Sequence, residues 1–308
     1  MGGLASFLGV RVAQSIITFI GIVIIIFFLV RVVPGDPARL LAGPEAEPED
    51  VELLRKQLGL DKPLYEQFWI YINSLVRGDL GRSFKTNEPV INEIMARLPY
   101  TIQLALVSEA IALSLGILIG VIAGLRPRSS IGYLASVIGI IGSSFPVFWT
   151  ALLLIWIFAV QLKVLPSSGA GTPAHIVLPA FTIALLLMGN IVRLVKSSVS
   201  EAYSSNHVVT AMSKGLKWNL VVLRHILKPA LIPVVTIAGL QFGQLMGGAI
   251  ITETVFGWPG IGRLLVDSIF MKDFMMTQGV VIVFAAIFLG VMIMVEIIQS
   301  ILDPRIRR

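Results

Sequence analysis

Six long runs of apolar residues, almost free of charge, dominate the sequence. They cover roughly residues 9–31, 99–125, 133–161, 174–195, 231–254 and 277–302. An α-helix rises ~1.5 Å per residue, so about 20 residues cross a ~30 Å hydrocarbon core, and each run is long enough. Of all residues, 56% are hydrophobic and 14% are charged, whereas soluble proteins carry roughly 25% charged residues. The runs therefore predict an all-α membrane protein with six transmembrane helices.

Basic residues are distributed unevenly between the two sides of these expected spans. The short segments on the side of the N-terminus carry Arg11, Arg126, Arg128, Arg193, Lys196, Lys214, Lys217, Arg224, Lys228, Arg305, Arg307 and Arg308. The short outer loops after the third and fifth spans carry Lys163, Arg263 and Lys272. Because Lys and Arg concentrate in short cytoplasmic loops, this bias predicts that both termini are cytoplasmic.

Residues that most chemistry requires are missing from the sequence. There is no cysteine, which excludes disulfides, thiolate nucleophiles and cysteine-based metal sites. The histidines His175, His207 and His225 lack the spacing of a paired metal site. No G-x-x-x-x-G-K-S/T, H-E-x-x-H or G-x-S-x-G pattern occurs, so we expect no triphosphate site and no catalytic residues. The basic residues behind the net charge of +6 lie at the ends of apolar runs, which argues against nucleic-acid binding.

The segment 34–97, between the first two runs, has a different character. It holds most of the acidic residues and turn signals such as Pro34-Gly35-Asp36-Pro37. Helical pieces are expected at 48–58, 63–77 and 89–97. We interpret the segment as a small extracytoplasmic subdomain packed on the membrane part, and the alternative is a loop that only covers the mouth. The chain then divides into a first transmembrane helix (1–33), this subdomain (34–97) and a five-helix core (98–308).

A long, basic loop, residues 196–233, joins the fourth and fifth runs. Helices that are neighbours are usually joined by ~2–8 residues, so a loop of this length needs structure of its own. It predicts two short helices folded back under the membrane with Gly215 at the break, because glycine turns at little cost. One interpretation is a basic amphipathic helix on anionic lipid. The small-residue turn favours the other, a protein-docking element made of Val209, Thr210, Ala211, Met212, Ser213, Lys214, Gly215 and Leu216.

Several polar side chains are stranded inside the apolar runs. Charged groups in a span are costly and normally face a bundle interior, a cavity or a partner. Pro146 and Pro179 are candidates for helix kinks beside a pathway. Glu109 and Glu296 also suggest the proton relay of a secondary transporter, although no inverted repeat supports it. The candidate pathway residues, each with an interhelix hydrogen bond as its alternative role, are Gln103, Glu109, Ser144, Asn190, Gln241, Gln244 and Glu296.

Two stripes of glycines repeat every four residues within the runs. They are Gly116, Gly120 and Gly124, and Gly239, Gly243 and Gly247. Small residues at this spacing let helix backbones approach closely. We expect them to pack within this chain, the alternative being contact with a partner subunit.

An ordered set of motifs along nearly the whole chain resembles one family. Thr210-Ala-Met-Ser-Lys-Gly-Leu216, followed by Leu223-Arg-His-Ile-Leu227 and Ala230-Leu-Ile-Pro-Val-Val235, resembles the coupling loop of ABC-importer permeases of the dipeptide/oligopeptide family. Val30-Arg-Val-Val-Pro-Gly-Asp-Pro37 resembles its signature after the first span. Leu58-Gly-Leu-Asp-Lys-Pro-Leu64 and Arg77-Gly-Asp-Leu-Gly-Arg-Ser83 resemble the outer subdomain of its B-type subunit. Glu253-Thr-Val-Phe-Gly-Trp-Pro-Gly-Ile-Gly262 and Leu165-Pro-Ser-Ser-Gly169 are similar to its outer loops.

The chain also departs from the family pattern in the coupling loop. Asn206-His-Val-Val209 stands where the family shows Asp-Tyr-Val-Arg, and Met212 and Ser213 replace an Arg and an Ala. Two positive charges are therefore missing from the expected docking surface, while Lys214 and Gly215 remain. The departures point to a divergent partner and leave the fold expectation unchanged.

The resemblance implies the type I importer permease fold and a multi-pass protein of the prokaryotic cytoplasmic (inner) membrane. The chain would form half the translocation pathway for dipeptides or oligopeptides, with no catalysis and no cofactor of its own. Its partners would be a second homologous permease, two ABC ATPase subunits that bind ATP and Mg²⁺, and an extracytoplasmic substrate-binding protein. Related machines carry nickel chelates, glutathione or oligosaccharides, and these stay open as alternatives to peptides.

Overall fold

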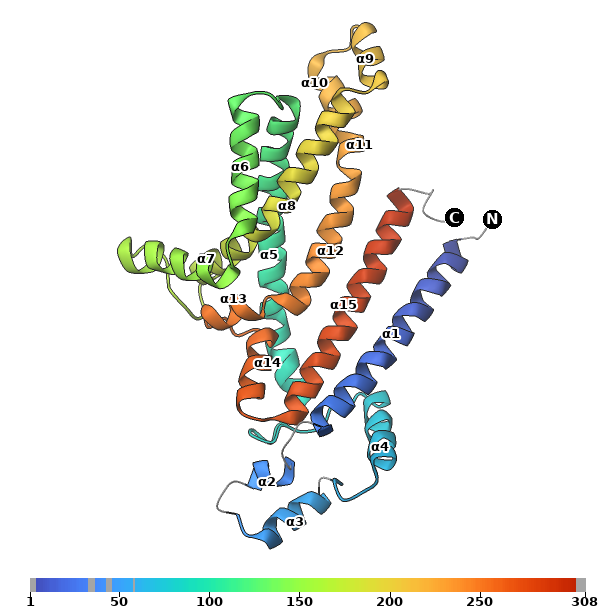
Figure 1. The fold of residues 1–308 in the computed structure, drawn as a ribbon, viewed down its shortest axis with the longest axis vertical. Helices are drawn as coiled ribbons and strands as arrows, with labels where there is room; N and C mark the ends of the chain where they lie inside the picture. The colour runs from blue at the N-terminus through green and yellow to red at the C-terminus, as the bar shows by residue number, and fades with distance from the viewer. Residues whose placement is uncertain (1–3, 33–36, 43–45, 58, 303–308) are drawn as a thin grey trace.

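The computed structural model describes residues 4–32, 37–42, 46–57 and 59–302, and these residues are predominantly helical. Figure 1 shows α5, α8 and α12 in the middle of the fold, with α6 on one side and α15 and α1 on the other. Arg82 and Pro89 form an isolated antiparallel β-bridge, the one β-pairing among the described residues. The expected all-α fold is confirmed. The main helices are α1 (Leu4–Val32), α5 (Val90–Leu125), α6 (Ser130–Ser144), α8 (Val177–Tyr203), α12 (Ile232–Gly248) and α15 (Phe274–Leu302).

Four helices among the described residues are long and apolar enough to cross a membrane. A fifth is added if Trp218–Ala230 and Ile232–Leu245, which meet at a bend of 46°, count as one span. These segments overlap the first, second, fourth, fifth and sixth apolar runs, but the expected number of six spans is not confirmed. The four are Gly9–Leu29, Val90–Leu125, Pro173–Tyr203 and Phe274–Ser300.

The third expected span, 133–161, is divided in two at Pro146, a candidate for a helix kink, and the structure does not confirm it as one membrane span. α6 ends at Ser144, and α7 (Val147–Leu154) with the π-helix η1 (Ile155–Gln161) points away from the bundle (Figure 1). Pro146 explains the break, because proline lacks an N–H and disfavours helical backbone in the residue before it. Accordingly, Phe145 is extended, with φ −90° and ψ 141°. Pro179, in contrast, lies in the first turn of α8, which continues unbroken.

The fifth expected span, 231–254, ends before its expected boundary. α12 ends at Gly248, and α13 (Ile250–Val255) turns aside toward α14 (Ile261–Phe270) (Figure 1). The run stays apolar through the turn, so hydrophobicity alone could not locate it. The segment before the last helix therefore consists of two short helices.

The glycine stripe of α5 packs against α8. A Cβ atom at Gly116 would lie 2.7 Å from Ile191 Cγ2, and one at Gly120 would lie 2.6 Å from Val195 Cβ. Gly124 meets Val199 in the same way, at 2.7 Å. Since real Cβ atoms do not come this close, the two backbones approach as they do because these positions are glycine. The expected packing within the chain is confirmed for this stripe.

The second stripe brings α12 against α15. A Cβ atom at Gly239 would lie 2.3 Å from Val295 Cγ2, and one at Gly243 would lie 2.3 Å from Met292 Cε. Packing within the chain is confirmed for these two glycines as well. The surroundings of Gly247 lie outside the described part of the structure.

The segment between the first two apolar runs forms α2 (Pro37–Ala42), α3 (Pro48–Gln57) and α4 (Leu64–Val76). The helices expected at 48–58 and 63–77 are confirmed by α3 and α4. α4 packs on α1, where the ring of Phe27 lies 5.0 Å from Phe68 and 5.5 Å from Tyr71, centroid to centroid. The helix expected at 89–97 is not separate but is the beginning of α5, which passes through Pro99. The boundary placed at 97/98 therefore falls inside a continuous helix.

The two ends of the molecule differ in character (Figure 1). α2, α3 and α4 lie at one end, and the short helices between α8 and α12 lie at the other. The beginning of α1 and the end of α15 lie on the side of those short helices. This arrangement agrees with termini and basic loop on one side of the membrane, while the cytoplasmic orientation itself stays a prediction.

Candidate functional site

The loop expected at 196–233 is a helix pair that protrudes from the bundle. α8 continues to Tyr203, beyond the end of the apolar run at 195, and carries α9 (Asn206–Ser213) at its tip. The chain returns through α10 (Trp218–Leu220), the π-helix η3 (Val221–Leu227) and α11 (Lys228–Ala230). Figure 1 shows this helix pair as the farthest point from α2 and α3. The expected two short helices are thus present, on an extended stem.

One face of α9 is buried and holds the pair together. Val208 and Ala211, three residues apart, belong to the same buried cluster as Val221 and Ile226 of η3. His207 Nε2 donates a hydrogen bond to the carbonyl of His225 at 2.9 Å. These contacts tie α9 to the returning segment, so the helix pair can move with α8 as one piece.

Gly215 forms the turn between the two halves of this helix pair. Its φ is +74°, a left-handed conformation that side chains with a Cβ adopt at a cost. No atom lies within 4 Å of the position that a Cβ would take. The requirement for glycine is therefore conformational and not a matter of space.

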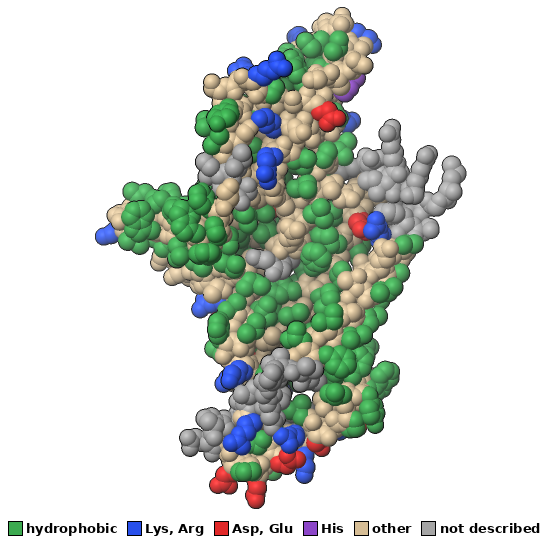
Figure 2. Space-filling view, viewed as in Figure 1, with side chains coloured by type: hydrophobic (Ala, Val, Ile, Leu, Met, Phe, Trp, Pro, Cys, Tyr) green, Lys and Arg blue, Asp and Glu red, His purple; other side chains and the backbone are tan. Residues whose placement is uncertain are grey.

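The opposite face of α9 is exposed and partly apolar. Val209 and Met212 have relative exposures of 56% and 48%. Seven of the eight predicted docking residues are on the surface, whereas Ala211 points inward and is not available for contact with a partner. Figure 2 shows basic and hydrophobic side chains side by side at this end. The exposed ones are Val209, Thr210, Met212, Ser213, Lys214, Gly215 and Leu216.

The predicted pathway residues are not gathered at one place. Gln103, Ser144, Asn190 and Gln244 are exposed, on four different helices. Gln241 is buried instead, and its Nε2 donates to the carbonyl of Leu187 at 3.2 Å. Gln241 thus fills the alternative role, an interhelix hydrogen bond.

Glu296 makes an ion pair between helices. Its Oε1 lies 3.1 Å from Arg11 Nη1, which connects α15 to α1. The apolar runs alone could not predict this pair, because Arg11 and Glu296 lie at opposite ends of the sequence. A structural contact therefore accounts for Glu296, and a proton relay between Glu109 and Glu296 has no geometric support.

Glu109 is different, because it is buried without a partner. Its relative exposure is 7%, and neither Oε1 nor Oε2 accepts a hydrogen bond from a described residue. The side chain lines a cavity of about 320 Å³ between α5, α12 and α15.

A polar groove of about 640 Å³ runs along the protruding part of α8, next to α6. Lys196 Nζ donates to Ser136 Oγ of α6 at 2.5 Å, and Asn190 Oδ1 accepts from Arg193 Nη2 at 2.6 Å. Figure 2 shows basic side chains along this part of the surface. The groove offers charges of both signs and hydroxyl groups to a hydrated, polar solute. Its lining residues are Ser136, Arg193, Lys196, Ser197, Ser200, Glu201 and Ser204.

A buried carboxylate that sequence reasoning missed holds the outer segment α13–α14. Glu253 is fully buried, and its Oε1 accepts from Thr101 Oγ1 at 2.7 Å while its Oε2 accepts from the backbone N–H of Arg263 at 3.0 Å. The carboxylate thus satisfies an N–H in the first turn of α14, where the helix dipole favours negative charge. A Cβ at Gly260 would lie 2.3 Å from the carboxylate, which explains why Gly260 has no side chain.

The segment 253–262, which contains Glu253 and Gly260, is also fixed to the N-terminal half of α5. The backbone N–H of Ile261 donates to Thr101 Oγ1 at 2.9 Å, and Trp258 Nε1 donates to the carbonyl of Tyr100 at 3.0 Å. The segment 253–262 therefore has a structural role, which is to hold α13 and α14 against α5. The only local signal for it was an acid at the end of an apolar run, followed by Pro-Gly.

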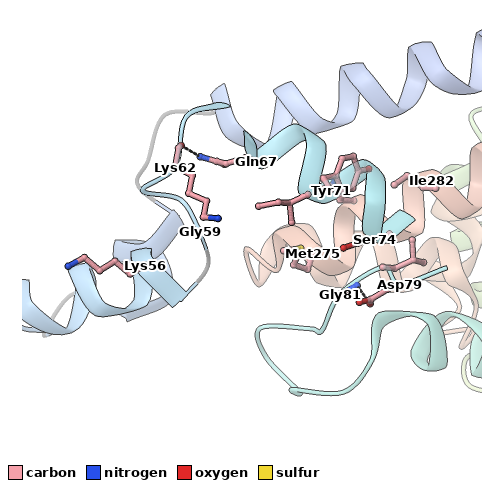
Figure 3. A pocket seen from close by; sticks show the side chains of 14 residues that line it. Lys56, Gly59, Lys62, Gln67, Tyr71, Ser74, Asp79, Gly81, Met275 and Ile282 are labelled. Atoms are coloured by element: carbon pink, nitrogen blue, oxygen red, sulfur yellow. Dashed lines mark hydrogen bonds between the residues drawn. The ribbon is translucent and has the colours of Figure 1, made fainter. Parts of the chain in front are cut away.

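A further cavity, of about 360 Å³, lies between α4, the turn at Gly81 and the beginning of α15 (Figure 3). Tyr71 and Ser74 of α4 face Met275 and Ile282 of α15 across it. α4 therefore borders a cavity at the last helix, and beside this cavity Tyr71 and Leu75 pack with Ile282. Among the described residues, no group of His, Asp and Glu could hold a metal ion.

Comparison with known proteins identifies relatives over nearly the whole chain. Residues 116–308 match the family described as binding-protein-dependent transport system inner membrane component, and residues 4–105 match its N-terminal part. The glutathione transport system permease protein GsiC of Escherichia coli O6:H1 is 41% identical over 297 residues, covering 96% of this chain and 97% of the relative. GsiC of Shigella dysenteriae serotype 1 has the same identity and coverage.

Solved structures show a related fold at low sequence identity. An inward-facing structure of the MetNI methionine ABC transporter aligns with a TM-score of 0.60 at 16% identity, covering 70% of this chain and 99% of that one. An amino acid ABC transporter with histidines aligns with a TM-score of 0.51 at 18% identity, covering 70% and 94%. At this identity the likeness concerns the fold alone.

Proposed function

This chain belongs to the family of binding-protein-dependent transport system inner membrane components, and on that premise we propose that it couples ATP hydrolysis by partner subunits to the import of short peptides. It is a type I ABC-importer permease subunit and a multi-pass inner-membrane protein. Relatives that are 41% identical are named for glutathione transport, and glutathione is itself a tripeptide. A small peptide of this kind is therefore the proposed substrate.

The observation that carries the coupling role is the exposed apolar face of α9. Val209 and Met212 stand at the tip of a helix pair whose inner face is buried against η3. Covering water-exposed apolar side chains with a partner protein lowers the free energy. Because α9 is fixed to the end of α8, a partner that displaces the tip also displaces α8, and α8 packs closely on α5 through the glycine stripe.

The partners follow from this assignment. Two ATPase subunits supply ATP and Mg²⁺ binding, one of them covering α9 of this chain, and a second permease completes the translocation pathway. The polar groove along α8 faces the route in its cytoplasmic half. The substrate-binding protein docks at the opposite end, beside α2–α4 and α14, and both termini lie in the cytoplasm.

Co-purification tests the docking surface. The whole complex is isolated from its native membrane through a tag on this chain, carrying Met212→Asp or, as the matched control, Met212→Leu. We expect the aspartate to remove the ATPase subunits from the complex while the second permease stays, and the leucine to retain both. Retention of the ATPases by the Met212→Asp chain, and likewise by Val209→Asp, would show that α9 is not the docking element.

A further inference from the structure

The feature with the least local explanation is the carboxylate of Glu109. It is 7% exposed, and both of its oxygens lack a hydrogen-bond donor among the described residues. A buried carboxylate without a partner is strongly unfavourable, most of all in the apolar part of a membrane. Something outside the described chain is therefore expected to complete this site.

The cavity that Glu109 lines is otherwise apolar. Of its described lining residues, none other than Glu109 carries a polar side chain. They are Val235, Ala238, Gly239 and Phe242 of α12 and Val291, Met294, Val295 and Ile298 of α15. Glu296, next to the lining residue Val295, is already paired with Arg11 of α1. The neighbourhood thus supplies apolar packing and one unsatisfied acidic group.

The position of Glu109 along α5 limits what can reach it. α5 has 36 residues, and at ~1.5 Å per residue Glu109 lies about 24 Å or more from either end of the helix. The apolar walls of the cavity offer no polar group to a lipid headgroup or to a hydrated peptide. A membrane-spanning helix fits these apolar walls and can bring a donor to this position along α5.

The shape of the cavity suits such an element. It is a groove between two helices, and its rim is exposed: Met294 and Ile298 of α15 have relative exposures of 56% and 46%. The lining residues recur at helical spacing along α12 and α15, and these two helices approach closely at Gly239. A third helix can pack along such a groove through apolar side chains.

We propose that this groove receives a transmembrane helix of the second permease subunit, which places one basic side chain against Glu109. The inference rests on the proposed function in requiring that a second permease exists. Charge complementarity selects the occupant, since an apolar helix with a single Lys or Arg satisfies both the walls and the carboxylate. Glu109 would then help to specify which permease is accepted, because a partner without the basic group leaves a buried charge unpaired.

Crosslinking tests the location. The chain has no cysteine, so a single Met294→Cys places a photoactivatable crosslinker at the groove in the intact complex. Ile17→Cys on α1, where Ile17 has a relative exposure of 69%, is the matched control. We expect Met294→Cys to crosslink to a spanning segment of the second permease and Ile17→Cys to crosslink to lipid.

Substitution tests the charge. Because Glu109 has no hydrogen-bond partner among the described residues, Glu109→Leu should leave the thermal unfolding temperature of the isolated chain unchanged or raised. The same change should lower the amount of co-purified second permease at least about tenfold, and replacing the partner's basic residue by leucine should restore it. If Glu109 had a purely structural role, Glu109→Leu would instead lower the unfolding temperature, and the second permease would be lost only in proportion to the unfolded chain.

Several results would overturn the proposal. Crosslinks from Met294→Cys to lipid only, or to another copy of this chain, would assign the groove a different occupant. Assembly that is indifferent to Glu109→Leu would remove the role of the charge. If the complex contains a second permease but shows neither the crosslink nor the response to Glu109→Leu, this inference alone is contradicted. If the complex contains no second permease, the proposed function is contradicted as well.

Discussion

Single buried polar groups decide how separate parts of this chain are joined. Glu253 joins α13 to the beginning of α14 and, through Thr101, to α5. Its hydrogen bonds are formed away from water, where leaving a donor or acceptor unsatisfied costs about 1–3 kcal/mol. Arg11 and Glu296, in contrast, are only partly buried and form an ion pair between α1 and α15. The site of a polar residue, and not its charge alone, sets its importance.

Gly260→Ala adds one methyl group and tests the hydrogen bonds that Glu253 makes to Thr101 and Arg263. The added Cβ would meet the Glu253 carboxylate at 2.3 Å, so the carboxylate must leave its hydrogen bonds. We expect a loss of about 1–3 kcal/mol in stability, the range of overpacked cores, seen as a lower unfolding temperature in detergent. Gly290→Ala in α15, which has no atom within 4 Å of its Cβ position, is the control and should be neutral or stabilising. Equal effects of the two changes would refute the assigned role of Glu253.

Two elements, α5 and α8, form the rigid centre of the chain, and α8 extends this centre into the protruding helix pair. The close approach at Gly116, Gly120 and Gly124 leaves no space between the helices for a side chain. The tip is joined to α8 by Ser204 and Ser205 and is closed by the turn at Gly215. Movement at α9 is therefore expected to reach the centre of the fold through one continuous helix.

Gly120→Ala tests the contact between α5 and α8. Its Cβ would lie 2.6 Å from Val195 Cβ and 3.1 Å from the carbonyl oxygen of Val192, so the helices must separate. A destabilisation of about 1–3 kcal/mol is expected, measured by thermal unfolding of the purified chain. Gly21→Ala in α1, with nothing within 4 Å, serves for comparison, and an unchanged unfolding temperature for Gly120→Ala would contradict the packing described.

Gly215 provides a graded test of the turn between α9 and α10. With φ at +74°, alanine should cost about 1–2 kcal/mol locally, and asparagine less, because its side chain tolerates left-handed backbone. We expect the affinity for the ATPase subunits to fall in the order Gly, Asn, Ala. The measurement is ATPase binding to detergent-solubilised chain, and an order that follows side-chain size instead would point to a steric effect at the docking surface.

At the scale of the whole molecule, local signals in the sequence predicted local structure well. The turn at Gly215 and the helices α3 and α4 were expected from glycine chemistry and from helical spacing. Pro146 was expected to kink a span, but the charge-free run gave no information on direction, so the division into α6 and α7 was missed. Hydrophobicity reports the length of an apolar run and not its path.

Contacts between distant segments could not be predicted from the sequence. Glu109 and Glu296 have the same signature, a lone acid in an apolar run, yet Glu296 pairs with Arg11 and Glu109 has no partner among the described residues. Thr101 lies 152 positions from Glu253, to which it donates. Such pairings are decided by how helices pack, which a single sequence does not contain.

Uptake into liposomes tests the central claim most directly. The complete complex, co-purified with its ATPases and second permease, is reconstituted with ATP inside and a substrate-binding protein and labelled tripeptide outside. We predict accumulation that requires internal ATP, persists after the proton gradient is collapsed, and disappears with Met212→Asp. Accumulation by this chain alone, driven by a proton gradient and indifferent to ATP, would contradict the account.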